Sequence, residues 1–264
     1  MIGLTWLGHA STVIDLDGVR IVTDPLLRSH AGLLRRVGPT PDPAVWQDPD
    51  VVLVSHLHLD HAEVASLRML GSAPVLTGPA NRPWLARRTP QLQVIDTPTG
   101  HWVRVGPEVE VRLVRADHEA RPMPHRPNDA HGHLVRGGGH VVWFAGDTSL
   151  HPEMEGLADL AGGRVDVALL PIAGWGPRLS EGHMGPSEAV EACARVRPAA
   201  VLPIHYGSLH ARGMGLPGVG LFGTGLGGLA WMQRPLSEFR AELAERCPEV
   251  TLLDLPPGGT TTWP

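Results

Sequence analysis

Three histidines and an aspartate lie within six residues, directly after a short apolar run. The run is Val51–Val54, and the polar stretch Ser55–His61 reads Ser-His-Leu-His-Leu-Asp-His. Neutral imidazole nitrogens and a carboxylate suit zinc, iron or manganese. Polar groups at this density after a hydrophobic strand need partners, because an unpaired buried polar group is costly. The stretch therefore predicts a metal site rather than a solvated histidine-rich loop.

The apolar run predicts a buried strand that carries the stretch to one edge of a sheet. Residues two apart on an extended chain point the same way, so His56 and His58 can converge on one point. Asp60 and His61 then turn toward a neighbouring point. A centre with two metal ions would use both groups.

Three further predicted strands each lead to a side chain that can bind a metal ion. These side chains are His118, Asp147 and His205, after strands expected to end near residues 114, 145 and 203. Gly146 would allow the backbone to come close at Asp147. Because strand ends can meet at one edge, we expect the three side chains to join the histidine-rich stretch.

The chain also repeats itself in three matched pairs of segments. In the first pair, Gly8-His9 leads through a hairpin to Asp24, and Gly132-His133 leads in the same way to Asp147. In the second pair, Asp50–Val54 resembles Asp166–Leu170. In the third pair, Ala73–Leu76 resembles Ala200–Leu202. The repeat predicts an α/β fold, a four-layer αββα sandwich of two pseudo-symmetric β-rich halves, with the site where their strand ends meet. We expect one domain over residues 1–264, with helices near 62–70, 82–88, 186–196 and 236–246 and irregular structure over 119–132.

The composition argues against several classes of function. The net charge is −5 and all 22 basic residues are arginines, which disfavours a dedicated nucleic-acid binder and excludes lysine-based Schiff-base or P-loop chemistry. No apolar run approaches the roughly 20 residues of a membrane helix, so we expect no stable membrane association. The first residues read as a strand rather than a secretory signal, and two cysteines cannot form a disulfide scaffold, which favours a cytoplasmic location.

The order of these residues resembles the metallo-β-lactamase superfamily of metal-dependent hydrolases. The resemblance runs from about residue 3 to 207 and rests on His-x-His-x-Asp-His, a later His, Gly-Asp-Thr and a strand-end His. Trp6–Ser11, Thr23–Pro25 and His183–Pro186 resemble the branch that includes L-ascorbate-6-phosphate lactonase and N-acyl-phosphatidylethanolamine phospholipase D.

This resemblance implies two divalent metal ions, zinc by preference, with manganese or iron as alternatives. His56, His58 and His118 would hold the first ion, Asp60, His61 and His205 the second, and Asp147 would bridge them. Binuclear centres of this kind have ions ~3.5–4 Å apart, and a hydroxide between them attacks the substrate. No protein nucleophile is then required.

Asp60 and His183 are the candidate catalytic residues. His183 precedes a predicted helix and could protonate the leaving group or donate to a substrate oxygen. His9 could share that role or orient Asp60 or Asp147, and Asp24 could support a ligand or cap a turn. Four loop residues could contact an anionic substrate or be solvated, and Trp175 could line a pocket or the core. The four are Arg121, His125, Arg126 and His131.

The sequence thus predicts a binuclear hydrolase of a small ester, lactone or phosphodiester, with a small-molecule substrate that could be anionic. One alternative is a nucleic-acid phosphodiesterase, which the negative charge disfavours. Another is a mononuclear iron oxidoreductase on the same scaffold, which the ligand types alone do not exclude. A homo-oligomer is compatible with the sequence.

Overall fold

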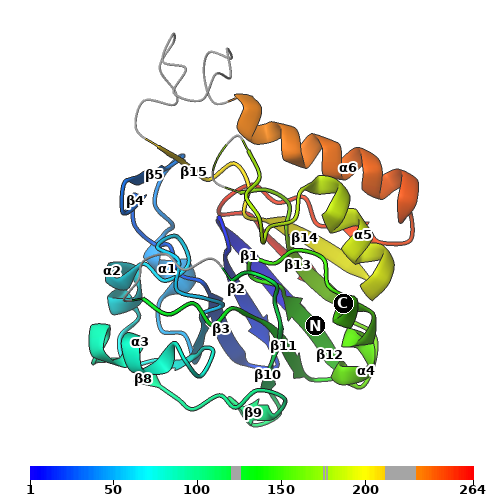
Figure 1. Ribbon diagram of the computed structural model, residues 1–264. Helices are drawn as coiled ribbons and strands as arrows, with labels where there is room; N and C mark the ends of the chain where they lie inside the picture. Colours follow the sequence, from blue (N-terminus) through cyan, green and yellow to red (C-terminus); the bar gives the residue numbers. More distant parts are fainter. Residues whose placement is uncertain (120–125, 175, 177, 212–229) are drawn as a thin grey trace.

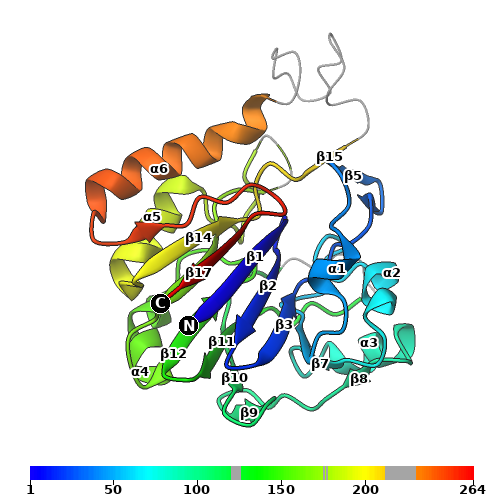
Figure 2. The same ribbon diagram turned by 180° about the vertical axis from the view of Figure 1, so that it is seen from behind.

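Two seven-stranded sheets face one another, and helices cover both outer faces (Figures 1 and 2). The computed structural model describes residues 1–119, 126–174, 176, 178–211 and 230–264. The first sheet has the order β17 (Thr260–Trp263), β1 (Ile2–Gly8), β2 (Ser11–Leu16), β3 (Val19–Thr23), β6 (Val51–Leu53), β7 (Pro74–Leu76), β8 (Gln93–Val94). The second has the order β9 (Trp102–Arg104), β10 (Glu110–Arg115), β11 (His131–Gly137), β12 (His140–Phe144), β13 (Val167–Pro171), β14 (Ala200–Ile204), β16 (Thr251–Leu252).

The two sheets repeat one topology, as the matched segments of the sequence predict. In each sheet the first four strands are joined by antiparallel pairings and the remaining pairings are parallel. One contact recurs at equivalent places: the Asp50 carboxylate accepts from the Arg20 backbone N–H in β3, and the Asp166 carboxylate accepts from that of Val141 in β12. The predicted sandwich of two pseudo-symmetric halves is therefore confirmed.

Both faces of the first sheet are buried, because successive side chains along its strands pack into two different hydrophobic clusters. In β6, Val51 and Leu53 pack in the core between the sheets, whereas Val52 packs on the outer side. This period of two follows from the pleat, which turns successive side chains to opposite faces. Helices α1 (Pro43–Trp46), α2 (Val64–Leu67) and α3 (Arg82–Arg88) lie beside the first sheet, and α5 (Pro186–Val196) and α6 (Arg234–Arg246) lie over the second (Figure 1).

Several elements differ from the sequence-based expectation. The helix expected over 62–70 is the short α2 followed by the 3-10 turn η1 (Arg68–Leu70), and β11 begins inside the segment expected to be irregular. The last strand, β17, pairs with β1 although nothing in the local pattern predicted it. A small third sheet joins β15 (Leu209–Ala211), β5 (Leu34–Arg36) and β4 (His30–Ala31).

The remaining elements are short connections. They are η2 (Pro152–Gly156), α4 (Leu157–Ala161) and η3 (Ala230–Gln233). The glycine-rich segment 213–228 lies outside the described residues. In the described part of the chain, no helix has the length and apolarity required to cross a membrane.

Candidate metal centre

The structure brings the seven predicted metal ligands together in one buried cluster. Their metal-binding atoms fall in two groups, and the atoms of each group lie within 4.8 Å of one another; a third group, which overlaps both, joins Asp24 to His56 and His61. The first group is His56, His58, His118 and Asp147; the second is Asp60, His61, His205 and also His9. The structure thus brings together the residues that the resemblance assigned to each ion, and adds His9 to the second group.

Asp147 lies between the two groups. Its Oδ2 atom is 3.0 Å from His61 Nε2 and 3.3 Å from His205 Nε2, both in the second group. The same oxygen is 3.8 Å from His56 Nε2 in the first group. A single carboxylate therefore faces both sets of imidazoles, which is the position that a bridging ligand requires.

The donor atoms of this cluster fit a pair of cations. His56 Nε2 and Asp147 Oδ1 are buried and have no hydrogen-bond partner among the described residues. His58 Nδ1 faces His118 Nε2 at 3.0 Å, and His61 Nε2 faces His205 Nε2 at the same distance. Buried polar atoms normally have partners, and imidazole nitrogens with carboxylate oxygens are a suitable donor set for zinc. The residues present therefore fit the implied metal ions.

Burial prepares two of the imidazoles to act as ligands. It lowers the pKa of His118 to about 4 and that of His56 well below its ordinary value. Both side chains are then neutral near pH 7, which is the form that binds a metal ion. Burial opposes the charged form of Asp147 as well, but His205 and His61 outweigh it and hold the pKa of Asp147 well below its usual range. The carboxylate is ionised.

Three carboxylates surround His61. Burial disfavours its charged form, but Asp147, Asp60 and Asp24 raise the pKa of His61 well above its ordinary value. Its Nδ1 donates to Asp24 Oδ2 at 2.6 Å, which leaves Nε2 directed at the cluster. A cation beside Nε2 would replace the proton there.

Asp24 positions His61 from the side of its ring that faces away from the cluster. Its carboxylate also accepts from the backbone N–H and the hydroxyl of Ser55, and Ser55 in turn contacts His56 Nδ1. Of the two roles that the sequence allowed, support of ligands is therefore the one that the contacts favour.

Replacing Asp24 with asparagine is expected to weaken metal binding by about 10- to 100-fold, because an amide of the same shape holds the His61 tautomer less strongly. Titration of the metal-free protein with zinc against a competing chelator measures this affinity. Asp15→Asn, at a half-exposed carboxylate on β2 that pairs with Arg20, is the matched control and should leave the affinity unchanged. Equal affinity in both variants would contradict the positioning role of Asp24.

His9 holds the other aspartate of the second group. His9 Nε2 lies 3.0 Å from Asp60 Oδ2, and His9 Nδ1 lies 2.9 Å from the Ser208 hydroxyl. Burial lowers the pKa of His9 to about 3, so its ring is neutral and donates one proton only. Orientation of Asp60 is thus the role that the contacts favour for His9, among those that the sequence left open.

Strained backbone surrounds these contacts. His9, Asp24 and His205 have φ angles of 57°, 31° and 61°, in the left-handed region that side chains other than glycine rarely adopt. The His9 carbonyl is fixed by two donors, the His205 backbone N–H and the Trp6 indole N–H. Strain of this kind persists only where the surroundings enforce it, and it gathers at functional sites.

Backbone carbonyls orient two more ligands, and no feature of the sequence predicts either contact. His118 Nδ1 donates to the Gly182 carbonyl at 2.8 Å, and His205 Nδ1 donates to the Ala173 carbonyl at 2.9 Å. A Cβ atom at Gly182, where φ is +78°, would lie 2.7 Å from His118 Nδ1. Only glycine therefore fits this place.

His183 lies over the cluster on the loop that leads into α5. Its Nε2 atom is 3.3 Å from Asp147 Oδ2, and its Nδ1 atom is 3.0 Å from the Ser180 hydroxyl. Its ring packs against those of His118 and His205. Burial disfavours the charged ring, but the contact with Asp147 raises the pKa of His183 above its ordinary value.

The other predicted loop residues lie apart from the ligand groups or outside the described residues. Arg126 is buried, stacks 4.2 Å from the Trp84 ring centre and donates to the Ala62 carbonyl, so it supports the segment after His61. His131 pairs with Asp129. Arg121, His125 and Trp175 are not among the described residues. Both cysteines are buried with raised pKa values, because burial disfavours the thiolate.

Comparison with known proteins agrees with this geometry. A family model described as a β-lactamase superfamily domain matches residues 19–206. A UPF0173 metal-dependent hydrolase of Methanopyrus kandleri is 32% identical over 209 residues, covering 78% of this chain and 84% of the relative. Its counterpart in Pyrobaculum neutrophilum is 29% identical over 209 residues with the same coverage.

Solved structures show the same fold. Igni18, a metallo hydrolase from Ignicoccus hospitalis, matches with a TM-score of 0.70 at 22% identity, over 100% of this chain and 98% of that one. An isothiocyanate hydrolase from Delia radicum gut bacteria matches with a TM-score of 0.66 at 14% identity, over 99% of each chain. The family model and the archaeal relatives together show that this chain belongs to the metallo-β-lactamase superfamily, beside proteins described as metal-dependent hydrolases.

Proposed function

We propose that this protein is a binuclear metal-dependent hydrolase that cleaves a small ester, lactone or phosphodiester. The observation that carries the proposal is the Asp147 carboxylate, which faces both groups of imidazoles from one position. The names of the archaeal relatives support metal-dependent hydrolysis. The segments Trp6–Ser11 and His183–Pro186 support a place near the lactonase branch.

The chain's own residues would hold the metal ions, orient the ligands and protonate the leaving group. His56, His58 and His118 would hold one ion, Asp60, His61 and His205 the other, and Asp147 both. When bound, such a pair of ions lowers the pKa of water toward about 7 and stabilises negative charge that develops on a substrate oxygen. Asp24 keeps His61 in place by contacting its Nδ1 atom. His9 keeps Asp60 in place by contacting its Oδ2 atom.

His183 would supply a proton to the leaving oxygen. Its ring faces the cluster through Nε2, which is the position that a proton donor to a leaving oxygen requires. The Ser180 hydroxyl and the carbonyls of Ser180 and Glu181 surround Nδ1, which fixes the orientation of the ring. The geometry thus suits a general acid.

Replacing His183 with alanine is expected to lower kcat by about 10²- to 10⁴-fold, the usual contribution of a positioned general acid. Metal content should not change, because His183 belongs to neither ligand group. The measurement is kcat as a function of pH, together with metal analysis of the purified variant. An unchanged kcat across the whole pH range would rule out the acid role.

The substrate class can be determined with a panel of lactones, acyl esters and phosphodiesters, assayed with zinc and with manganese. We expect metal-dependent turnover in at least one of these three classes. We propose a small molecule rather than a nucleic acid, because the chain carries a net charge of −5. Turnover of RNA alone would overturn this choice, and absence of turnover together with a single bound iron would overturn the hydrolase proposal.

A further inference from the structure

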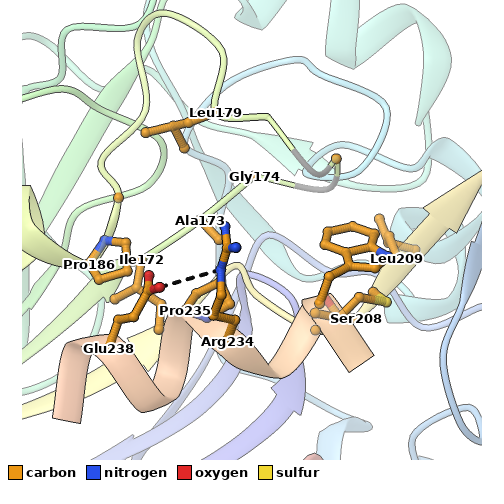
Figure 3. Close-up of a pocket in the computed structure, with 15 residues that line it drawn as sticks. Ile172, Ala173, Gly174, Leu179, Pro186, Ser208, Leu209, Arg234, Pro235 and Glu238 are labelled. Carbon is orange, nitrogen blue, oxygen red and sulfur yellow. Dashed lines mark ion pairs between the residues drawn. The ribbon is translucent and has the colours of Figure 1, made fainter. Parts of the chain in front are cut away.

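A pocket lies beside the metal centre, between the loop after β13, the segment after β14 and the beginning of α6 (Figure 3). Its volume is about 150 Å³. Most of the side chains that line it are apolar; they include Ile172, Leu179, Pro186, Leu209, Met232 and Pro235. Figure 3 shows Leu179 on the loop that arches above the pocket, with α6 below it.

The walls of this pocket continue into the metal centre through direct contacts. Ala173 lines the pocket, and its carbonyl accepts from the metal-binding residue His205. Ser208 lines it too, and its hydroxyl contacts His9, which holds Asp60. The pocket and the second ligand group therefore share wall residues, with the pocket on one side and the ligands on the other.

The charge of the pocket is balanced by its own residues. Arg234 and Glu238 are the charged side chains that line it among the described residues, and Arg234 Nε lies 3.3 Å from Glu238 Oε1. The exposed fraction of the side chain is 68% for Arg234 and 49% for Glu238. The two charges cancel, so the pocket selects neither an anion nor a cation, and its apolar walls favour an uncharged group.

We propose that this pocket binds an uncharged apolar group of the substrate, an aryl ring or a short alkyl chain, while the ester or lactone group lies at the metal centre. The volume supports this size, because an apolar cavity of about 150 Å³ accepts a benzene-sized molecule. The position of the reacting group rests on the proposed hydrolase function, whereas binding of the apolar group does not.

Fluorobenzene is a suitable probe of the pocket by itself, with binding followed by ¹⁹F NMR on the metal-free and metal-loaded protein. Leu179→Asp introduces a carboxylate at the pocket, and Leu179→Trp reduces its volume. Both are expected to weaken fluorobenzene binding at least tenfold. Leu179 is 45% exposed, so neither change should disturb folding; Leu33→Asp, at an 88% exposed position outside the pocket, is the matched control.

A second measurement compares p-nitrophenyl hexanoate with p-nitrophenyl acetate, which share one leaving group. We expect metal-dependent kcat/KM to favour the hexanoate by at least tenfold, and Leu179→Asp to remove this preference while Leu33→Asp keeps it. Fluorobenzene binding that Leu179 controls, without hydrolysis of any ester, would uphold the pocket and count against the hydrolase. The pocket proposal would be overturned if fluorobenzene did not bind, or if it bound equally well to the wild type and to both Leu179 variants.

Discussion

Replacing Asp147 with alanine is expected to lower metal-dependent turnover by about 10³-fold or more, the largest effect of any single change in the cluster. The reason is that its carboxylate faces His56 in one ligand group and His61 and His205 in the other. Removal of a ligand shared by two ions forfeits several kcal/mol of charge stabilisation, and each 1.36 kcal/mol corresponds to about a factor of ten in rate. The measurements are kcat/KM and the number of ions bound per chain.

Asp159→Ala is the control for this change, because Asp159 is an exposed carboxylate on α4 and belongs to neither ligand group. It should retain full metal content and turnover. If Asp147→Ala kept both ions and full turnover, the carboxylate would not be a shared ligand. The two ligand groups would then have to bind ions independently.

Removal of metal ions should destabilise the whole fold as well as abolish activity. The cluster joins strand ends of both sheets, so bound ions would link the two halves of the sandwich. A ligand present at about 1,000 times its Kd stabilises the native state by about 4 kcal/mol, and each kcal/mol shifts Tm by about 2–4 °C in a chain of 150–250 residues. We therefore expect dialysis against a chelator to lower Tm by roughly 10 °C.

Calorimetry before and after dialysis measures this shift, and addition of zinc to the dialysed protein should restore both Tm and turnover. The Asp147→Ala variant provides the internal comparison, because its Tm should respond much less to the chelator. A wild-type Tm that the chelator leaves unchanged would contradict a cluster that binds ions tightly.

The sequence predicted the architecture because the chain repeats itself. The segments around Asp50 and Asp166 begin equivalent strands, and both carboxylates accept from the backbone of the neighbouring strand. β17 was missed because it depends on pairing with β1, at the opposite end of the chain. β15 was missed for the same reason, because its partner β5 lies far away in sequence. β4 and β5 form a local hairpin, but two and three residues are too few to show the alternation of a strand.

The candidate ligands could be predicted because each stands at the end of an apolar strand, where its type and position carry the signal. Orientation of a ligand was one of the roles predicted for His9 and for Asp24. The parts of Ser208 and Gly182 could not be predicted. Ser208 contacts His9 across 199 residues, and Gly182 accepts from His118 through its carbonyl, which any residue type possesses. Tertiary contacts therefore help to determine how the ligands of this centre are held, and the local sequence around each ligand does not show them.

Metal analysis of the wild-type protein, purified without chelators, tests the central claim most directly. We expect about two divalent ions per chain, because there are two groups of donors and the Asp147 carboxylate faces both. Loss of both ions should accompany loss of hydrolysis. One iron per chain, with no hydrolysis of any lactone, ester or phosphodiester, would contradict the binuclear hydrolase.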